Sequence, residues 1–239
     1  MSIGLVLVVL VAAVLLWIRA GTYEPKSLAM EAQVSDPQVK VGRIDEGLLF
    51  QPTEPVKEEA VVFYQGALVE EASYSYWARQ LAAAGYPVYL LHHPFNLAVL
   101  STVDVAEMVQ EEGIAEYVVG GHSLGGVMAS RYANEHLKDA ALKGVFYLAS
   151  YPDEKGSLLS FEGKVLSVNG SNDGVVSQES SQNAKQWLPA QTVFKEIDGG
   201  NHAGFGDYGF QKGDQAATIT NKEQQDQLVK LLLDWLSTN

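Results

Sequence analysis

Short apolar runs alternate with amphipathic segments along most of the chain, from about residue 38 to the end. An apolar run of about four to eight residues is typical of a buried strand, whereas apolar positions three and four apart are typical of a helix that packs one face. The pattern predicts strands at residues 39–44, 47–51, 60–64, 87–91, 116–120, 144–149, 164–169 and 192–196. It predicts helices at residues 71–84, 102–112, 124–136, 178–187 and 222–236.

The order of these elements predicts a mostly parallel sheet. Strands separated by helices of about ten to fifteen residues form βαβ units, in which neighbouring strands run the same way. The first two strands have no helix between them, so we expect an antiparallel pair at one edge. The runs at 61–64 (VVFY) and 116–120 (EYVVG) are apolar on both faces, as strands between two helical layers require. The predicted fold class is therefore α/β, a three-layer α/β/α sandwich with a doubly wound sheet of about eight strands. Residues 150–162 are too few to form a cap domain, so we expect the sandwich to be uncapped.

Residues 3–18 form a separate apolar run, IGLVLVVLVAAVLLWI, without a polar side chain. As a helix this run would be about 24 Å long, slightly less than the ~30 Å of a bilayer's hydrocarbon core. Trp17 suits the membrane interface and Arg19 can reach the headgroups. A membrane anchor, a signal peptide and a buried core helix are the three interpretations. We favour the anchor, because the run lacks a basic start, a following A-x-A site and a polar stripe.

The apolar run divides the chain into three parts. Residues 1–20 are predicted to be a hydrophobic N-terminal segment, either a membrane anchor or an uncleaved signal. Residues 21–37 show no sustained period and are predicted to be a tether, and residues 38–239 are predicted to form the folded domain.

Composition excludes several classes of function. The chain has 16 Lys and Arg residues against 29 Asp and Glu residues, and its formal net charge is −13. Because this charge repels phosphate backbones and no basic patch interrupts it, we expect no nucleic-acid partner. The chain has no Cys, which excludes disulfides, thiolate metal sites and a cysteine nucleophile.

The motif GGHSLGG at residues 120–126 lies directly between a predicted strand and a predicted helix. It contains G-x-S-x-G, with Ser123 at the centre; the pattern alone is weak, but its place between strand and helix adds weight. A serine on such a tight turn projects its hydroxyl above the sheet, and the Leu124 N–H at the helix start can stabilise an oxyanion. The alternative is a glycine-rich turn that serves packing alone.

A serine hydroxyl needs a base to take its proton. Of the five histidines, His202 has the best position, in the glycine-rich loop 199–204 that follows the strand at 192–196. We expect the His122 side chain to point away from that of Ser123, and we expect His136 to carry a surface charge. The neighbours His92 and His93 face opposite ways on an extended chain, so they cannot jointly hold a metal ion. The alternative for His202 is an ordinary polar loop residue.

Asp173 is the predicted third member, because GSNDGVV at residues 170–176 directly follows the strand at 164–169. The chain order is then Ser–Asp–His. The alternative is an aspartate that caps its own turn, and Asp198 is too close to His202 along the chain to be preferred. A second oxyanion donor should follow an earlier central strand, and we expect it to be the Ala67 N–H; an ordinary loop is an equal alternative there.

These motifs together resemble the alpha/beta-hydrolase superfamily across residues 39–239. The missing cap resembles the small dienelactone-hydrolase-like branch, and residues 63–100 are similar to capless bacterial members with an N-terminal hydrophobic segment. Two positions depart from relatives: dienelactone hydrolases have a cysteine in place of Ser123, and many superfamily members have His-Gly where this chain has Gln65-Gly66. The resemblance implies a membrane-tethered enzyme with an extracytoplasmic catalytic domain, although basic residues follow the apolar run, which by itself favours the opposite side.

The expected function is hydrolysis of a carboxylic ester or related small acyl compound through an acyl-enzyme. Ser123 would be the nucleophile, His202 the base and Asp173 the group that orients it, with no metal or organic cofactor. One alternative is the same triad used for peptide cleavage, acyl transfer or perhydrolysis. The other is a binding protein that keeps the hydrolase fold without turnover.

Overall fold

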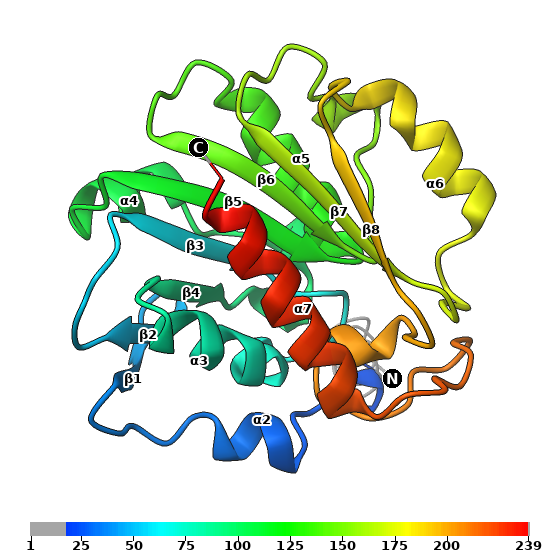
Figure 1. Cartoon of the computed structure of the whole chain (residues 1–239), viewed down its shortest axis with the longest axis horizontal. Helices are drawn as coiled ribbons and strands as arrows, with labels where there is room; N and C mark the ends of the chain where they lie inside the picture. Colours follow the sequence, from blue (N-terminus) through cyan, green and yellow to red (C-terminus); the bar gives the residue numbers. More distant parts are fainter. Residues whose placement is uncertain (1–17, 239) are drawn as a thin grey trace, which may run out of the picture.

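The computed structural model describes residues 18–238, which fold around one eight-stranded sheet (Figure 1). The strands follow the order β1-β2-β4-β3-β5-β6-β7-β8 across it. Their bounds are β1 (Val39–Ile44), β2 (Gly47–Pro52), β3 (Glu59–Tyr64), β4 (Val88–Leu91), β5 (Glu116–His122), β6 (Leu142–Leu148), β7 (Lys164–Gly170) and β8 (Val193–Ile197).

The predicted strand directions are confirmed. The pair β1–β2 is antiparallel and lies at one edge, β2 pairs antiparallel with β4, and every other neighbouring pair in this sheet is parallel. From β3 the chain moves outward to β4 and then returns to the other side of β3 to form β5. The strand order therefore reverses between β3 and β5, and a crevice at the carboxyl ends of such strands is the usual ligand site of an open α/β sheet.

Helices cover both faces of the sheet, so the predicted three-layer α/β/α fold class is confirmed. In the view of Figure 1, α3 (Ser75–Ala83) and α7 (Asn221–Leu236) lie in front of the sheet. On the opposite face lie α4 (Val105–Glu111) and α5 (Leu124–Glu135). The predicted helix at 71–84 begins as a 3₁₀ turn, and α6 (Gln178–Ala184) ends in another.

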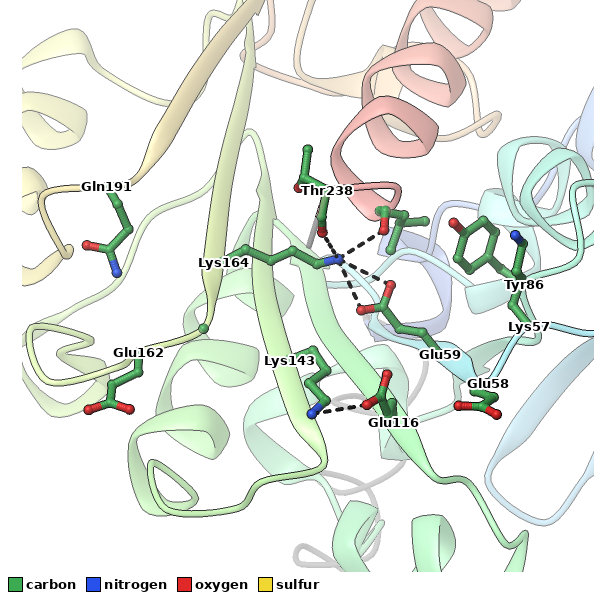
Figure 2. A pocket seen from close by; sticks show the side chains of 12 residues that line it. Lys57, Glu58, Glu59, Tyr86, Glu116, Lys143, Glu162, Lys164, Gln191 and Thr238 are labelled. Carbon is green, nitrogen blue, oxygen red and sulfur yellow. Dashed lines mark hydrogen bonds and ion pairs between the residues drawn. The ribbon is translucent and has the colours of Figure 1, made fainter.

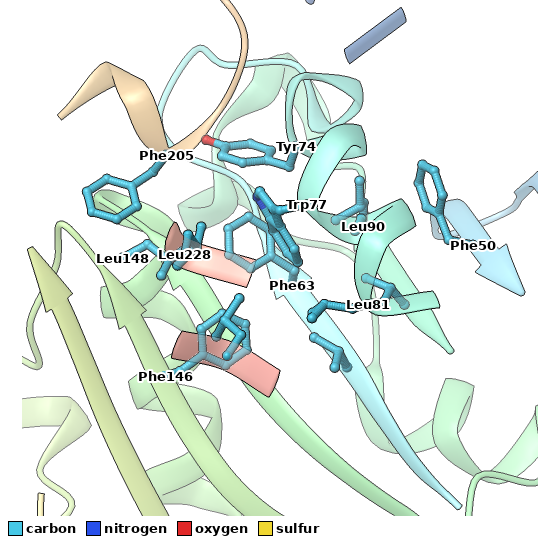
Figure 3. Close-up of a cluster of buried hydrophobic side chains, with 14 of the residues drawn as sticks. Phe50, Phe63, Tyr74, Trp77, Leu81, Leu90, Phe146, Leu148, Phe205 and Leu228 are labelled. Carbon is cyan, nitrogen blue, oxygen red and sulfur yellow. The ribbon is translucent and has the colours of Figure 1, made fainter. Parts of the chain in front are cut away.

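The larger apolar core lies between the sheet and the pair α3–α7 (Figure 3). The ring of Phe63 on β3 lies 4.8 Å from the ring centres of both Tyr74 and Trp77, and 5.9 Å from that of Phe146 on β6. Leu228 of α7 is fully buried beside these rings. Rings that meet at such separations add to the free energy of burial, so this cluster fixes α3 firmly on the sheet.

The segment predicted to be a tether lies against the domain. The Tyr23 N–H donates to the carbonyl of Leu68 at 2.7 Å, and the Ala29 N–H donates to Oδ2 of Asp207 at 3.0 Å. The segment includes the short helix α2 (Ser27–Glu31), which the sequence pattern did not predict. Five residues make less than two helical turns, too few for a period of 3.6 to be recognised.

The apolar run at 3–18 lies outside the described residues except for Ile18. Within residues 18–238, no helix combines the length and the apolarity that a membrane span requires.

Candidate active site

Ser123 forms the turn between β5 and α5 by itself. Its backbone angles, φ 52° and ψ −123°, are ones that residues with a side chain rarely adopt, at a cost of about 1–3 kcal/mol. A serine that precedes a helix usually caps it by accepting a backbone N–H, but the Ser123 hydroxyl makes no such bond. The strained turn thus leaves the oxygen uncommitted at the carboxyl edge of the sheet.

Two glycines make this turn possible. A Cβ atom on Gly121 would lie 2.3 Å from the carbonyl carbon of Gly125, and one on Gly125 would lie 2.2 Å from the carbonyl oxygen of Tyr64. Both distances are far inside van der Waals contact, so any side chain here would force the helix away from the strands. The glycines bring the positive end of α5 directly against the end of β3.

The structure brings Asp173 and His202 together. Oδ2 of Asp173 lies 2.9 Å from Nδ1 of His202, and both side chains are almost completely buried. Oδ1 of Asp173 accepts the N–H groups of Val175 and Val176, each at 2.8 Å. Asp173 therefore caps its own turn with one oxygen and contacts the imidazole with the other. A carboxylate at Nδ1 holds the hydrogen on that nitrogen and leaves the lone pair on Nε2.

Nε2 of His202 is buried and has no hydrogen-bond partner among the described residues, the Ser123 hydroxyl included. An unpaired buried acceptor costs about 1–3 kcal/mol. The residue before Ser123 lies close by, because the ring centres of His122 and His202 are 4.6 Å apart. The Ser123 turn and the His202 loop are therefore neighbours, and the His202 loop contributes a buried nitrogen without a hydrogen-bond partner among the described residues.

A second carboxylate, Asp214, joins the loops of Asp173 and His202. Its Oδ1 accepts the N–H of Gly174 at 2.9 Å and that of His202 at 3.3 Å, and its Oδ2 accepts the N–H of Ala203 at 2.8 Å. Sequence reasoning missed this role. Asp214 lies in a loop that follows no strand, so no local signal distinguishes it from other acidic loop residues.

The two expected oxyanion donors have N–H groups that make no hydrogen bond to any of the described residues. Leu124 is the first residue of α5, where a helix has no acceptor of its own to offer. Within residues 18–238, the Ala67 N–H also has no acceptor. The neighbouring Gly66 N–H donates to the hydroxyl oxygen of Tyr74 at 3.0 Å and is thereby excluded as a donor to substrate.

The remaining histidines have other surroundings. His92 lies at the surface, with Nδ1 2.9 Å from a carboxylate oxygen of Glu71, while His93 is buried and stacks on the ring of Tyr64. These two side chains thus face opposite ways. Burial lowers the pKa of His93 to about 4. Burial also lowers the pKa of His122 well below its ordinary value, so both imidazoles are neutral at pH 7.

Two cavities lie at opposite edges of the sheet. One of about 440 Å³ borders Asp173 and Ser150, and the Ser150 hydroxyl donates to the carbonyl of Ser123 at 2.5 Å. A larger one of about 710 Å³ opens at the amino ends of the strands, where the ion pairs Lys164–Glu59 and Lys143–Glu116, each at 3.1 Å, line it (Figure 2). The larger cavity holds none of the predicted site residues. No group of three metal-ligating side chains occurs within residues 18–238.

Comparison with known proteins agrees with the geometry. A family model described as the alpha/beta hydrolase family matches residues 60–226, more than half of the chain. No curated protein matches the chain.

Solved structures share the fold at low sequence identity. A novel esterase from Mycobacterium tuberculosis is similar with a TM-score of 0.62 and 12% identity, over 88% of this chain and 95% of that one. The esterase domain of a Rhodothermus marinus protein has a TM-score of 0.60 and 14% identity, over 83% and 97% of the two chains. A predicted CIB-like hydrolase from Thermoplasma acidophilum has a TM-score of 0.56 and 17% identity, over 82% and 98%.

Proposed function

Because the chain belongs to the alpha/beta hydrolase family, we propose that it is a serine hydrolase that cleaves a carboxylic ester or a related acyl compound through an acyl-enzyme. The observation that carries this proposal is the 2.9 Å contact between Asp173 and His202, whose other ring nitrogen is buried and unpaired next to the strained turn of Ser123. A buried, unpaired imidazole nitrogen close to a turn that holds an uncommitted serine hydroxyl suits nucleophilic catalysis.

In the first half of the reaction, Nε2 of His202 takes the hydroxyl proton of Ser123 as Oγ bonds to the carbonyl carbon of the substrate. The carbonyl π electrons move to oxygen, and the N–H groups of Leu124 and Ala67 stabilise the resulting oxyanion. When the oxyanion collapses, the bond to the leaving oxygen breaks and the imidazolium gives its proton to that oxygen. The product is an alcohol, and the acyl group stays on Ser123.

In the second half, a water molecule replaces the alcohol. Nε2 of His202 takes a proton from the water, and the resulting hydroxide oxygen bonds to the acyl carbon. Collapse of this second oxyanion breaks the bond to Oγ of Ser123 and returns the proton to it. The carboxylic acid leaves, and the chain needs no cofactor or metal for either half.

The substrate that we propose is a small acyl compound. The cavity beside Asp173 has about 440 Å³, which is within the ordinary range for a small-molecule site. Its lining includes the hydroxyl of Ser150 and the amides of Asn169 and Gln182. Charged side chains, among them Lys185 and Glu196, line it as well, so the cavity suits a polar portion of the substrate. Assignment to the dienelactone-hydrolase-like branch stays a prediction from the sequence.

We also propose that residues 3–18 anchor the chain to a membrane, with the domain on the extracytoplasmic side. Besides the apolar sequence, the site where it enters the fold supports this. Ile18 and Arg19 line a hollow together with Phe95, and the nearby Val99 is also about half exposed. Exposed apolar side chains beside the entry point suit a lipid surface.

Fractionation of cells tests the anchor. The full chain should sediment with membranes, and a chain that begins at residue 21 should not. Sidedness can be read with one engineered cysteine, because the chain has none of its own: Lys138→Cys, at an exposed position, should react with a membrane-impermeant maleimide in intact cells. Reaction only after lysis would place the domain on the other side.

A fluorophosphonate probe and a p-nitrophenyl ester test the catalytic proposal. The chain should be labelled and should hydrolyse the ester, and Ser123→Ala should abolish labelling and lower kcat by several orders of magnitude. Equal labelling or turnover of the variant would refute Ser123 as nucleophile. A folded chain that neither reacts nor turns over would favour the binding-protein alternative. Comparison of esters, peptides, acyl acceptors and peroxide would distinguish the possible reactions of one triad.

A further inference from the structure

His122 is a fully buried imidazole that the proposed reaction does not use. Its Nε2 lies 3.1 Å from the backbone carbonyl oxygen of His202, and its Nδ1 lies 2.9 Å from the hydroxyl oxygen of Tyr74. A carbonyl oxygen can only accept, so Nε2 must carry the hydrogen. Nδ1 of the neutral ring is then the acceptor, and the Tyr74 hydroxyl donates to it.

The Tyr74 hydroxyl makes a second hydrogen bond. Its oxygen accepts the Gly66 N–H at 3.0 Å. The complete series is Gly66 N–H to Tyr74, Tyr74 O–H to Nδ1 of His122, and Nε2–H of His122 to the carbonyl of His202. Each donor has one acceptor, and one tautomer of a neutral His122 satisfies the whole series.

The surroundings of His122 keep that tautomer neutral. The ring faces the rings of His202, Phe205 and Tyr208, at centre-to-centre distances of 4.6, 6.1 and 6.3 Å, and the hydroxyl of Tyr74. Desolvation lowers the pKa of His122 and raises the pKa of Tyr74. Both shifts favour the uncharged forms, so the series is intact at neutral pH.

These contacts connect three loops that the proposed reaction must align. His122 is bonded covalently to the nucleophile residue, Gly66 precedes the expected oxyanion donor Ala67, and the carbonyl belongs to the proposed base itself. The fit is tight, because a Cβ atom on Gly66 would lie 2.7 Å from Nδ1 of His122. Movement of the ring would therefore displace the oxyanion loop on one side or the His202 loop on the other.

We propose that His122 and Tyr74 are positioning residues, which hold the Ala67 amide and the His202 imidazole at fixed places on either side of Ser123. This inference rests on the proposed function. The hydrogen bonds from Gly66 to Tyr74 and from Tyr74 to His122 (the Tyr74 arm) fix the position of the oxyanion loop. The hydrogen bond from His122 to the carbonyl of His202 (the His202 arm) fixes the position of the base. An error of about 1 Å at either place is enough to cost up to a hundredfold in rate.

Three substitutions separate the two arms. Tyr74→Phe removes one hydroxyl and keeps the packing of the ring. In His122→Asn the side-chain oxygen takes the place of Nδ1 and keeps the Tyr74 arm, whereas in His122→Gln the longer side chain brings an amide N–H near the place of Nε2 and keeps the His202 arm. Tyr147→Phe is a matched control, because the buried Tyr147 hydroxyl bonds to Ser130 at 2.6 Å and takes no part in the series.

We expect Tyr74→Phe to lower kcat on a p-nitrophenyl ester about tenfold to a hundredfold with KM nearly unchanged, since the oxyanion exists only after attack. His122→Asn and His122→Gln should each lose less than His122→Phe, which breaks both arms. Tyr147→Phe should lose about as much free energy of unfolding as Tyr74→Phe, measured with urea, and should keep the wild-type kcat. Wild-type kcat in Tyr74→Phe and His122→Phe, or a loss that appears in KM alone, would overturn the proposal.

A spectroscopic measurement does not depend on activity. In ¹⁵N-histidine-labelled wild type, the imidazole nitrogens of His122 should report the neutral Nε2–H tautomer, unchanged from pH 5 to 8. A His122 that titrates in this range, or carries its hydrogen on Nδ1, would overturn the positioning role even if the enzyme is active. If the chain is inactive and does not react with the fluorophosphonate, the proposed function fails while the tautomer remains measurable.

Discussion

The carboxyl and amino edges of the sheet differ in backbone strain and in the charged groups that they hold. Within residues 18–238, every residue other than glycine with positive φ lies at the carboxyl edge, in the loops after β3, β4, β5 and β6. These residues are Leu68, Phe95, Asn96, Ser123 and Ala149. At the amino edge, no residue of the described chain other than glycine has positive φ, and ion pairs join Lys164 to Glu59 and Lys143 to Glu116. Each strained residue costs about 1–3 kcal/mol, so such a concentration marks the edge where geometry matters beyond stability.

Within residues 18–238, three side chains at the carboxyl edge have unpaired polar atoms, although Trp235, beside Lys164 near the amino edge, has one as well. Gln65, His93 and His202 at the carboxyl edge each have a buried side-chain atom without a hydrogen-bond partner among the described residues. At the amino edge, Lys164 bonds to Glu59 and to two carbonyls at the chain end. The amino edge nevertheless has the larger cavity. Backbone strain therefore identifies the candidate site better than the size of a cavity does.

Removal of one carboxylate from each edge should give the largest difference in activity between the two edges. Asp173→Asn should lower kcat by about 10³- to 10⁴-fold, because an amide cannot hold the imidazole in the tautomer that leaves Nε2 basic. Glu59→Gln, at the amino edge, should leave kcat unchanged. Steady-state hydrolysis of a p-nitrophenyl ester measures both. Equal losses would show that activity does not distinguish the edges.

A methyl group added at each of two glycines should distinguish a crowded position from an open one. Gly125→Ala forces a Cβ atom to 2.2 Å from a backbone oxygen, and we expect it to cost about 3 kcal/mol or more in the free energy of unfolding. Gly42→Ala, on the edge strand β1, has no atom within 4 Å of the added carbon and should change stability by less than about 1 kcal/mol. Urea denaturation gives both values. A tolerated Gly125→Ala would contradict the tight turn.

Acid should destabilise the fold through the carboxyl edge. His93 is neutral when folded, with a pKa of about 4, but in the unfolded chain it binds a proton below about pH 6.5. Its contribution to stability is therefore complete above that pH and is lost as the pH falls toward 4, by about 2 kcal/mol at pH 5.

His93→Phe tests this directly, since it keeps a ring against Tyr64 and removes both unpaired nitrogens. The free energy of unfolding should fall less steeply between pH 7 and 5 in the variant than in wild type, with the buried His122 accounting for part of the remaining slope. Identical slopes would mean that His93 is protonated in the folded chain.

The smallest effect is expected from Lys164→Met at the amino edge. Burial raises the pKa of Glu59, and the lysine opposes this shift. Loss of the partly exposed ion pair should cost about 1–2 kcal/mol in the free energy of unfolding and nothing in kcat. Thermal unfolding measures the loss of stability, and ester hydrolysis measures kcat. A large loss of activity would make the amino-edge cavity a functional site after all.

Local pattern was enough to predict most elements of the fold. The observed strands begin and end within about two residues of the predicted ones, because alternating buried runs and glycine turns are visible in any window of the chain. The strained Ser123 turn follows for the same reason, since its glycines are sequence neighbours. By contrast, the docking of residues 22–37 depends on partners such as Asp207, which the local pattern cannot indicate.

The sequence alone determined which residue types stand at the ends of which strands: a serine after β5, an aspartate after β7 and a histidine after β8. Tertiary structure decided their partners. It placed Asp214 under the loops of Asp173 and His202, and it brought Tyr74 to a histidine 48 positions away. The physical reason is that strand identity is a short-range property of the chain. Contacts between loops depend on the order of strands across the sheet, and that order follows from packing of the whole domain.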